Sequence, residues 1–282
     1  MSERTTGDSH SRRNVLKGIG ALGAAAAGAG FATGNAAALG SGAVYQYYHT
    51  DWTTIESDLS TLADQGYDAI QVPPAQFSRV YKYEREYTGE KYDPPLGYQP
   101  IDLLDFDSEF GTEAEYESMV QEAHNQGLEV IADAVINHMA AGGNTFDRQV
   151  SLADLPQFGS DDFHPECDID YSSDYSVEGC WLVGLRDLKQ ESSYVRGELK
   201  KYVDKYRSLG VDGIRWDAAK HVPEWFFEDY ANEWASDIYT VGEVIPQSSG
   251  GKSELDYLQG YADTGMSVTD YKLYRVMKNQ VF

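Results

Sequence analysis

The stretch Gly213-Ile214-Arg215-Trp216-Asp217 decides the fold, because it has the pattern of a buried strand that ends on a carboxylate. Two other apolar stretches, 128–136 and 239–244, carry Asp133 and Glu243 at or near their carboxyl ends. Enzymes built on a closed parallel barrel place their reacting side chains at the carboxyl ends of several strands. The three acidic residues therefore predict one site at one face of a parallel barrel.

Strand and helix patterns alternate along the chain on both sides of this stretch. Short apolar runs predict strands at 43–48, 67–72, 128–136, 211–216 and 239–244. Apolar periodicity predicts helices at 51–66, 112–126, 192–209 and 224–236, with a further strand end and helix after Val268. Repeats of strand and helix at roughly 30–40 residues indicate βαβ units and a parallel sheet. An open doubly wound sheet and a closed (β/α)₈ barrel both fit, and the carboxylates at the strand ends favour the barrel.

Two stretches interrupt this alternation. Residues 76–105 are rich in Tyr, Pro and Gly and predict a long loop, whereas 137–189 are polar, lack a sustained helical period and contain both cysteines. Between these stretches, Thr112 and Glu115 have the spacing of a capping box at the start of a helix.

The chain is strongly acidic. It holds 46 Asp and Glu residues against 22 Lys and Arg, a formal net charge of -24 at pH 7. This balance argues against nucleic-acid partners and anionic membrane surfaces, because both attract clustered basic side chains. An excess of carboxylates keeps proteins soluble at high salt. We therefore favour a halophilic, salt-rich habitat over the alternative of an ordinary acidic surface.

The N-terminal segment 1–38 has the pattern of an export signal. Residues 11–17 (SRRNVLK) match a twin-arginine signal, and an uncharged Gly- and Ala-rich run leads to three alanines at 36–38, a small-residue cleavage site. A transmembrane helix is the alternative, since no charge occurs from 18 to 50. Large apolar residues are sparse in that run, so we expect secretion without a stable membrane anchor.

Asp217 and Glu243 have the chemistry of a pair that cleaves a glycosidic bond. In such a pair one carboxylate attacks the anomeric carbon, while the other carboxyl group protonates the leaving oxygen and later activates water. Arg215 lies two residues before Asp217, so both side chains point to one face of the strand and the guanidinium favours an ionised aspartate. Apolar neighbours of Glu243 favour a protonated acid. The alternative for either carboxylate is a helix cap or a surface charge.

Three motifs resemble, in order, the first three signature regions of the α-amylase family of retaining glycoside hydrolases: 133–138 (DAVINH), 213–221 (GIRWDAAKH) and 242–244 (GEV). A fourth stretch, 184–188 (GLRDL), resembles the loop motif of this family before the next barrel helix. The resemblance implies a secreted α/β protein with a (β/α)₈ TIM barrel. It also implies an inserted loop domain after the third strand, which divides the mature chain into 39–138, 139–189 and 190–282.

The fourth signature region of the family, which supplies a third essential carboxylate from a later strand, has no counterpart after Glu243. The printed sequence stops where we expect the sixth helix. The resemblance therefore implies a C-terminally truncated chain with an incomplete barrel of about six βα units.

The resemblance assigns a role to each site residue. Asp217 is expected to be the nucleophile and Glu243 the general acid/base. Arg215 is expected to position Asp217, and Asp133 to be an orienting carboxylate. Sugar contacts are expected from Arg215 and from an aromatic ring, two imidazoles and an ammonium group: Tyr98, His138, His221 and Lys220. Apart from the motifs, each of these side chains also fits an ordinary structural or surface role.

The resemblance further implies a structural Ca²⁺, because hard cations prefer carboxylate, amide and backbone oxygens. The implied ligands are the side chains of Asn137 and Asp187 and the main-chain oxygens of Glu178 and His221. The alternative for Asn137 and Asp187 is that they cap turns.

The two cysteines favour a disulfide over two buried thiols, since an exported protein meets an oxidising compartment. The stretches 163–167 and 178–181 resemble the disulfide-bearing inserted domain of the family, which implies a bridge between Cys167 and Cys180.

The implied function is endo-hydrolysis of α-1,4-glucosidic bonds in starch or malto-oligosaccharides by a monomer, impaired by the truncation. One alternative is a non-catalytic carbohydrate-binding remnant, which the missing third carboxylate favours. Another is a related α-glucan transglycosidase or disaccharide isomerase, because a fold does not fix the reaction. The implied disulfide and the stretch 186–188 favour the hydrolase.

Overall fold

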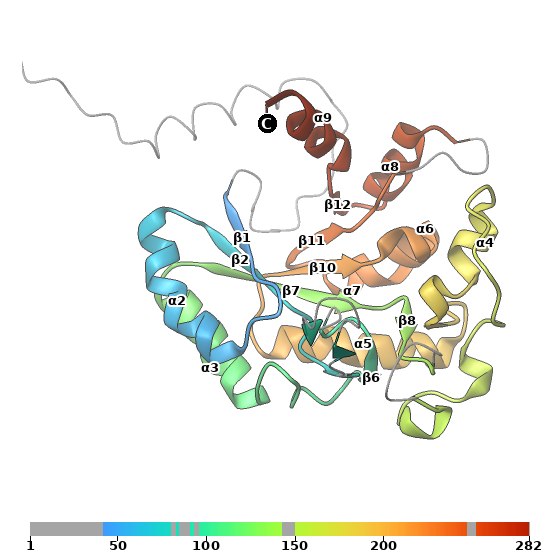
Figure 1. Ribbon diagram of the computed structural model, residues 1–282, viewed down its shortest axis with the longest axis horizontal. Coiled ribbons are helices and arrows are strands. Elements are labelled where there is room, and N and C mark those ends of the chain that lie inside the picture. The colour runs from blue at the N-terminus through green and yellow to red at the C-terminus, as the bar shows by residue number, and fades with distance from the viewer. Residues whose placement is uncertain are drawn as a thin grey trace, which may run out of the picture.

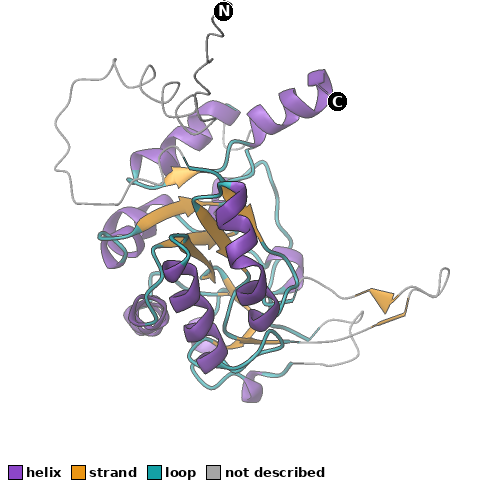
Figure 2. Cartoon of the chain, turned by 90° about the vertical axis from the view of Figure 1, so that its left-hand side faces the viewer, coloured by secondary structure: helices purple, strands orange, loops and turns teal. Residues whose placement is uncertain are grey.

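The computed structural model describes residues 42–79, 83–84, 91–92, 96–142, 150–246 and 252–281 of the chain. The expected signal peptide at 1–38 lies outside these residues. No helix in the described ranges is long and apolar enough to cross a membrane. Helices pack around a central sheet, and α9 and the C-terminus lie beyond its last strand, β12 (Figures 1 and 2).

The sheet has six parallel strands in the described part of the chain, in the order β1-β2-β7-β10-β11-β12. They are β1 (Val44–Gln46), β2 (Ala69–Val72), β7 (Glu129–Val135), β10 (Gly213–Asp217), β11 (Tyr239–Gly242) and β12 (Ser267–Val268). Neighbouring strands follow chain order, whereas a doubly wound sheet reverses its order at a switch point. The prediction of an incomplete parallel barrel is therefore confirmed, and the doubly wound alternative is wrong.

The pairing register brings the acidic residues of three strands together. Strand β10 lies between β7 and β11, and Arg215 is opposite Asp133 on one side and Val241 on the other. Glu243 follows β11 directly, and its backbone N–H donates to the carbonyl of Trp216 at 2.9 Å. Because the strands are parallel, their carboxyl ends meet at one edge of the sheet.

The helices lie close to the predicted ranges. They are α2 (Trp52–Gln65), α3 (Glu113–Asn125), α5 (Ser193–Ser208), α6 (Glu224–Phe226), η5 (Phe227–Ala231), α7 (Asn232–Trp234), α8 (Glu254–Asp263) and α9 (Tyr271–Val281). The predicted capping box of Thr112 and Glu115 at the start of α3 is confirmed. The single helix predicted at 224–236 has a π-helical centre, η5. Helix α8 is an addition to the predicted elements, and its sequence signal is a capping box of Ser253 and Asp256.

The two stretches without predicted regular structure contain short elements. Antiparallel pairs join β3 (Phe77–Ser78) to β6 (Pro100–Asp102), β4 (Tyr83–Glu84) to β5 (Lys91–Tyr92), and β8 (His138–Met139) to β9 (Arg186–Asp187). The described residues of the long loop expected at 76–105 therefore contain four short strands. The pair of β8 and β9 brings the two ends of 137–189 together. Between them lie η1 (Leu152–Asp154), η2 (Ser160–Asp162), α4 (Asp174–Gly179) and η3 (Leu182–Gly184).

A cluster of aromatic side chains joins helix α5 to the sheet. Its fully buried members are Trp52, Phe106, Tyr116, Tyr202 and Tyr206. The hydroxyl of Tyr206 accepts a hydrogen bond from the backbone N–H of Ala75 at 2.8 Å and donates to the carbonyl of Asp133 at 2.9 Å. One buried hydroxyl thus ties α5 to the segment after β2 and to the middle of β7.

Substitution Tyr206→Phe is expected to lower the free energy of unfolding by about 1–3 kcal/mol, because it leaves a buried N–H and a buried carbonyl without their partner. Urea unfolding followed by circular dichroism measures the change. The matched control is Tyr175→Phe, at a side chain that is 87% exposed. An unchanged midpoint for Tyr206→Phe would show that the hydroxyl carries no such link.

Candidate active site

Arg215 lies at the centre of three carboxylates. Its Nη1 atom lies 2.6 Å from both Oδ1 and Oδ2 of Asp133 and 3.1 Å from Oδ1 of Asp217. Its Nη2 atom lies 2.9 Å from Oε2 of Glu243. Asp133 comes from β7, Arg215 and Asp217 from β10, and Glu243 directly follows β11, so the four side chains belong to adjacent strands. The shortest contacts of the guanidinium are to Asp133, so Arg215 holds this carboxylate at least as closely as that of Asp217.

Glu243 has polar partners on both carboxyl oxygens. Oε2 accepts from Arg215 and, at 3.3 Å, from the backbone N–H of Ala218. Ala218 has a left-handed backbone (φ 48°), which turns the chain directly after Asp217 and aims this N–H at the glutamate. Oε1 accepts from the hydroxyl of Tyr271 at 2.8 Å. The apolar setting expected for Glu243 from its neighbours in sequence is therefore wrong, because these partners come from other parts of the chain.

The electrostatics of the cluster favour partial protonation of its buried carboxyl groups. One guanidinium faces three carboxylates, two of which, Asp133 and Asp217, are buried. Burial raises the pKa of Asp133, and the nearby Arg215 opposes this effect. Burial and the negative charge of Asp133 raise the pKa of Asp217, again opposed by Arg215. The guanidinium is therefore the group that allows the aspartates to ionise in a buried setting.

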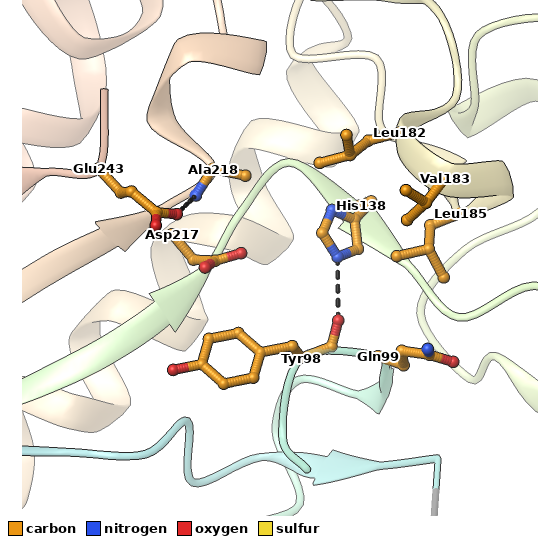
Figure 3. A pocket seen from close by; sticks show the side chains of 9 residues that line it. All are labelled: Tyr98, Gln99, His138, Leu182, Val183, Leu185, Asp217, Ala218 and Glu243. Carbon is orange, nitrogen blue, oxygen red and sulfur yellow. Dashed lines mark hydrogen bonds between the residues drawn. The ribbon is translucent and has the colours of Figure 1, made fainter. Parts of the chain in front are cut away.

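Asp217 and Glu243 open into a pocket of about 210 Å³ (Figure 3). One wall is apolar and is formed by residues that the sequence interpretation did not single out for sugar contact: Leu182, Val183 and Leu185. Val183 is 81% exposed and has a left-handed backbone (φ 47°), an unusual conformation for a β-branched residue. The only sequence signal for this wall is the neighbouring stretch 184–188.

Tyr98 and His138 also line the pocket. The hydroxyl of Tyr98 donates to Oδ2 of Asp133 at 2.8 Å, and Nε2 of His138 donates to the Tyr98 carbonyl at 3.0 Å (Figure 3). Burial lowers the pKa of His138 to about 4, so the imidazole is neutral near pH 7. Asp133 therefore holds the Tyr98 hydroxyl and His138 holds the Tyr98 backbone at the pocket.

Lys220 and His221 are buried next to the site but are not part of the pocket wall around Asp217. The ammonium of Lys220 lies 5.1 Å from the centre of the Tyr171 ring, and burial lowers its pKa. Nδ1 of His221 donates to the carbonyl of Val177 in α4 at 2.9 Å. These contacts tie the end of the 213–221 motif to the segment between β8 and β9.

Oxygen atoms converge where the calcium site is expected. Nε2 of His138 donates its hydrogen to Tyr98, so its Nδ1 accepts, and it does so from Nδ2 of Asn137 at 3.2 Å. The other amide atom of Asn137, Oδ1, then lies 2.8 Å from the His221 carbonyl oxygen and 3.3 Å from Oδ2 of Asp187. Three acceptors so close together need a cation or a donor between them. The alternative is a rotated amide, which gives up the hydrogen bond to the accepting Nδ1.

This donor set fits a hard cation. Within the described residues no cluster of three or more His, Cys, Asp or Glu side chains forms a metal site. The expected ligands do not form such a cluster, because they combine one carboxylate and one amide with main-chain oxygens. The structure brings Asn137, Asp187 and His221 together. It places Glu178 in α4, directly after the Val177 carbonyl that accepts from His221.

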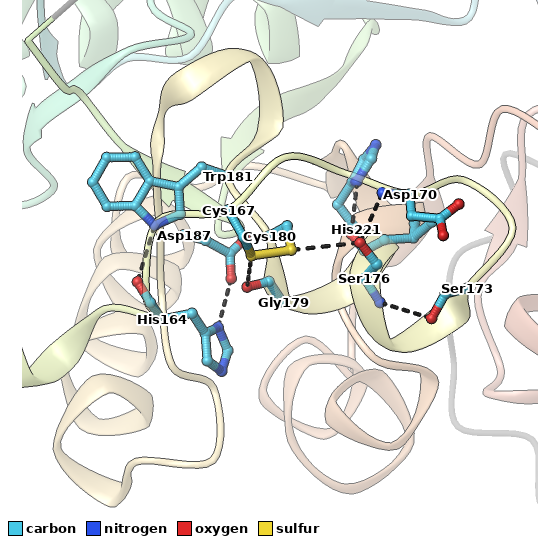
Figure 4. Close-up of a disulfide and its surroundings, with 11 residues drawn as sticks. His164, Cys167, Asp170, Ser173, Ser176, Gly179, Cys180, Trp181, Asp187 and His221 are labelled. Atoms are coloured by element: carbon cyan, nitrogen blue, oxygen red, sulfur yellow. Dashed lines mark hydrogen bonds and ion pairs between the residues drawn. A yellow bond between two sulfur atoms is a disulfide. The ribbon is translucent and has the colours of Figure 1, made fainter.

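The predicted disulfide between Cys167 and Cys180 is confirmed (Figure 4). It closes a loop that contains α4, and the backbone N–H of Trp181 donates to the Cys167 carbonyl at 3.2 Å. Nearby, Nδ1 of His164 lies 2.6 Å from Oδ1 of Asp187. The bridge therefore holds α4, with Val177 and Glu178, beside the converging oxygens.

A parallel barrel sheet with an aspartate and a glutamate at its carboxyl edge is the arrangement expected of the barrel enzymes that cleave glycosides. The chain belongs to the α-amylase family: residues 28–270 match the family model described as "Alpha amylase, catalytic domain".

Known relatives and solved structures agree with this family. The chain is 32% identical over 212 residues to Alpha-amylase 2 of Schizosaccharomyces pombe, covering 72% of this chain and 35% of the relative. It is 31% identical over 237 residues to Alpha-amylase of Hypothenemus hampei, with 79% and 44% covered. A solved complex of a mutant α-amylase I from Eisenia fetida with maltohexaose superposes with a TM-score of 0.69 at 27% identity, with 85% and 51% covered. The chain thus spans about half the length of that structure, and less of these two relatives.

Substitution Asp133→Asn is expected to change how stability depends on pH. An aspartate with a raised pKa in the folded state binds more protons there than in the unfolded chain, so stability falls as pH rises from about 4 to that raised pKa. The variant loses this group and also lowers the pKa of Asp217, which Asp133 raises. Its free energy of unfolding, relative to wild type, should rise by roughly 1–3 kcal/mol between about pH 5 and pH 8.

Urea unfolding at several pH values measures this difference. The matched control is Asp168→Asn, which makes the same substitution at an exposed residue outside the cluster. A difference for Asp133→Asn that is flat or falls with pH would contradict the coupling between the two aspartates.

Proposed function

We propose that this chain carries the site for endo-hydrolysis of α-1,4-glucosidic bonds in starch and malto-oligosaccharides, with retention of configuration. The observation that carries the proposal is that Asp217 and Glu243 line one pocket and that both carboxyl groups contact the same guanidinium. The family and the maltohexaose bound by the Eisenia fetida relative support this class of substrate.

In the proposed reaction Asp217 attacks the anomeric carbon while Glu243 gives its proton to the leaving glycosidic oxygen. Glu243 then takes a proton from water, whose oxygen displaces Asp217 from the sugar. Arg215 stabilises the ionised form of Asp217. Tyr98 and His138 hold the sugar beside the scissile bond, the first by stacking and the second by a hydrogen bond from a neutral ring. Lys220 and His221 act on the leaving-group side.

Asp217→Asn and Glu243→Gln are each expected to lower the release of reducing ends from soluble starch by roughly 10²–10⁴-fold, because each removes a group that acts in the transition state. The assay uses the full chain in high salt with Ca²⁺. The matched control Glu228→Gln changes an exposed glutamate of η5 and should keep wild-type activity.

The same assay, together with a binding measurement, distinguishes two other functions. Binding of maltohexaose by calorimetry without any hydrolysis by the wild-type chain would favour a carbohydrate-binding protein. Longer or rearranged glucans among the products would favour a transglycosidase. Full activity of Asp217→Asn would contradict the assignment of the nucleophile.

A structural Ca²⁺ is the second part of the proposal. Asn137, Asp187 and the main-chain oxygens of His221 and Glu178 would hold it, and the converging oxygens around Asn137 support the site. A bound cation would fix the segment of β9 and α4 against the end of the 213–221 motif, and so steady the pocket wall.

Removal of Ca²⁺ by a chelator is expected to lower the melting temperature of the wild-type chain, because the cation binds the folded state only. Asp187→Ala should bind Ca²⁺ at least about tenfold more weakly by calorimetry, and chelation should no longer change its melting temperature. Asn125→Ala, which changes an exposed asparagine at the end of α3, is the matched control. Equal Ca²⁺ affinity of Asp187→Ala and wild type would contradict the site.

The domain organisation, export and habitat of the protein form the third part of the proposal. We propose that 139–189 form a loop domain inserted into a barrel whose parts are 39–138 and 190–282, and that the protein is a secreted monomer exported through the twin-arginine signal at 1–38. The pairing of β8 with β9 supports the insertion, and the disulfide suits an oxidising compartment. The net charge of -24 supports a salt-rich habitat.

A further inference from the structure

We propose that Tyr271 is a positioning residue for Glu243, and that its hydroxyl holds the carboxyl oxygen from which the proton is transferred. This inference rests on the proposed function, because it concerns the step in which Glu243 acts as an acid. The observation behind it is the 2.8 Å hydrogen bond from the Tyr271 hydroxyl to Oε1 of Glu243.

The segment after β12 forms hydrogen bonds to the backbone on both sides of Glu243. The N–H of Thr269 donates to the Gly242 carbonyl at 3.1 Å, and the Thr269 hydroxyl accepts from the N–H of Val244 at 3.2 Å. Tyr271, two residues later, is the first residue of α9. The β12 segment therefore fixes the backbone of the glutamate and supplies a partner for its side chain.

The two oxygens of Glu243 differ in their partners. In the described part of the chain, Oε2 faces two N–H donors, Nη2 of Arg215 and the backbone N–H of Ala218. Neither donor can accept a hydrogen bond. A carboxyl oxygen has two lone-pair directions, and both on Oε2 are occupied by these donors. The proton of the neutral acid is therefore placed on Oε1, where one direction faces Tyr271 and the other stays available.

The hydrogen bond from Tyr271 strengthens as the reaction proceeds. When Glu243 gives its proton to the glycosidic oxygen, the C–O bond breaks, Asp217 bonds to the anomeric carbon, and negative charge develops on the glutamate. A hydroxyl that donates to a carboxylate is held more strongly than one that donates to a neutral acid. Tyr271 keeps its own proton throughout, and burial together with the charge of Glu243 raises its pKa. Its contribution is thus larger in the transition state than in the ground state.

The test compares two substrates that differ in how much they need an acid. Maltohexaose has a poor leaving group, so its cleavage depends on protonation, whereas a dinitrophenyl α-maltotrioside has a leaving group that departs without it. Tyr271→Phe is expected to lower kcat/KM, which reports the reaction up to departure of the leaving group, roughly tenfold for maltohexaose and less than about twofold for the dinitrophenyl substrate. Glu243→Gln should show the same pattern in kcat/KM with a larger loss on maltohexaose, while its kcat for the dinitrophenyl substrate also falls because Glu243 activates the water.

The matched control is Tyr274→Phe, which removes the hydroxyl of a tyrosine on the same helix that is 57% exposed. It should leave both rates unchanged. An equal loss on both substrates for Tyr271→Phe, or no loss on either, would overturn the positioning role while the hydrolase proposal stands. A wild-type chain without activity on either substrate would overturn the proposed function itself.

A second measurement does not need activity. In the chain labelled with ¹³C at the tyrosine ring carbon that bears the hydroxyl, the resonance that Tyr271→Phe removes identifies Tyr271. Substitution Glu243→Ala should move this resonance toward that of the exposed Tyr274, because the acceptor of the Tyr271 hydrogen bond is lost. An unmoved resonance would show that the contact is absent and would overturn the inference.

Discussion

The rest of the site depends on one guanidinium that is shared by three carboxylates. Asp133, Asp217 and Glu243 come from three strands, and each places an oxygen within 3.1 Å of a terminal nitrogen of Arg215. Two buried aspartates would repel one another and lose their hydration without this positive charge. The same charge lets Asp217 ionise at the bottom of a pocket. Arg215 therefore both pairs the buried charges and favours the ionised form of Asp217, the proposed nucleophile.

The parallel sheet makes this sharing possible. Arg215 lies opposite Asp133 because β10 pairs with β7 in a fixed register, and Glu243 follows a strand on the other side of β10. A slip by one residue would turn Arg215 away from this face. The aromatic cluster under α5 and the Tyr206 hydroxyl hold β7 in place from the other side. The packing of the aromatic cluster therefore helps to fix the strand that carries Asp133.

The segment between β8 and β9 adds what the sheet cannot provide. It supplies the apolar wall of the pocket, Leu182, Val183 and Leu185, and brings Asp187 to Asn137. Its disulfide and the contact of His221 with Val177 attach it beside the end of β10. The segment after β12 supplies Tyr271, which contacts Glu243. The site is therefore formed by parts of the chain that precede, interrupt and follow the central strands.

The sequence by itself determined the alternation of strands and helices, the carboxylates at the strand ends and the capping box of α3, because each depends on neighbours a few residues apart. It also identified the cysteines that form the disulfide, through resemblance to a family. Only the tertiary structure decided that Arg215 contacts Asp133 most closely, that Glu243 has polar partners, and that Leu182, Val183 and Tyr271 reach the site. These contacts join residues that are tens of positions apart, and their geometry follows from strand register and loop packing, which no local pattern of residues encodes.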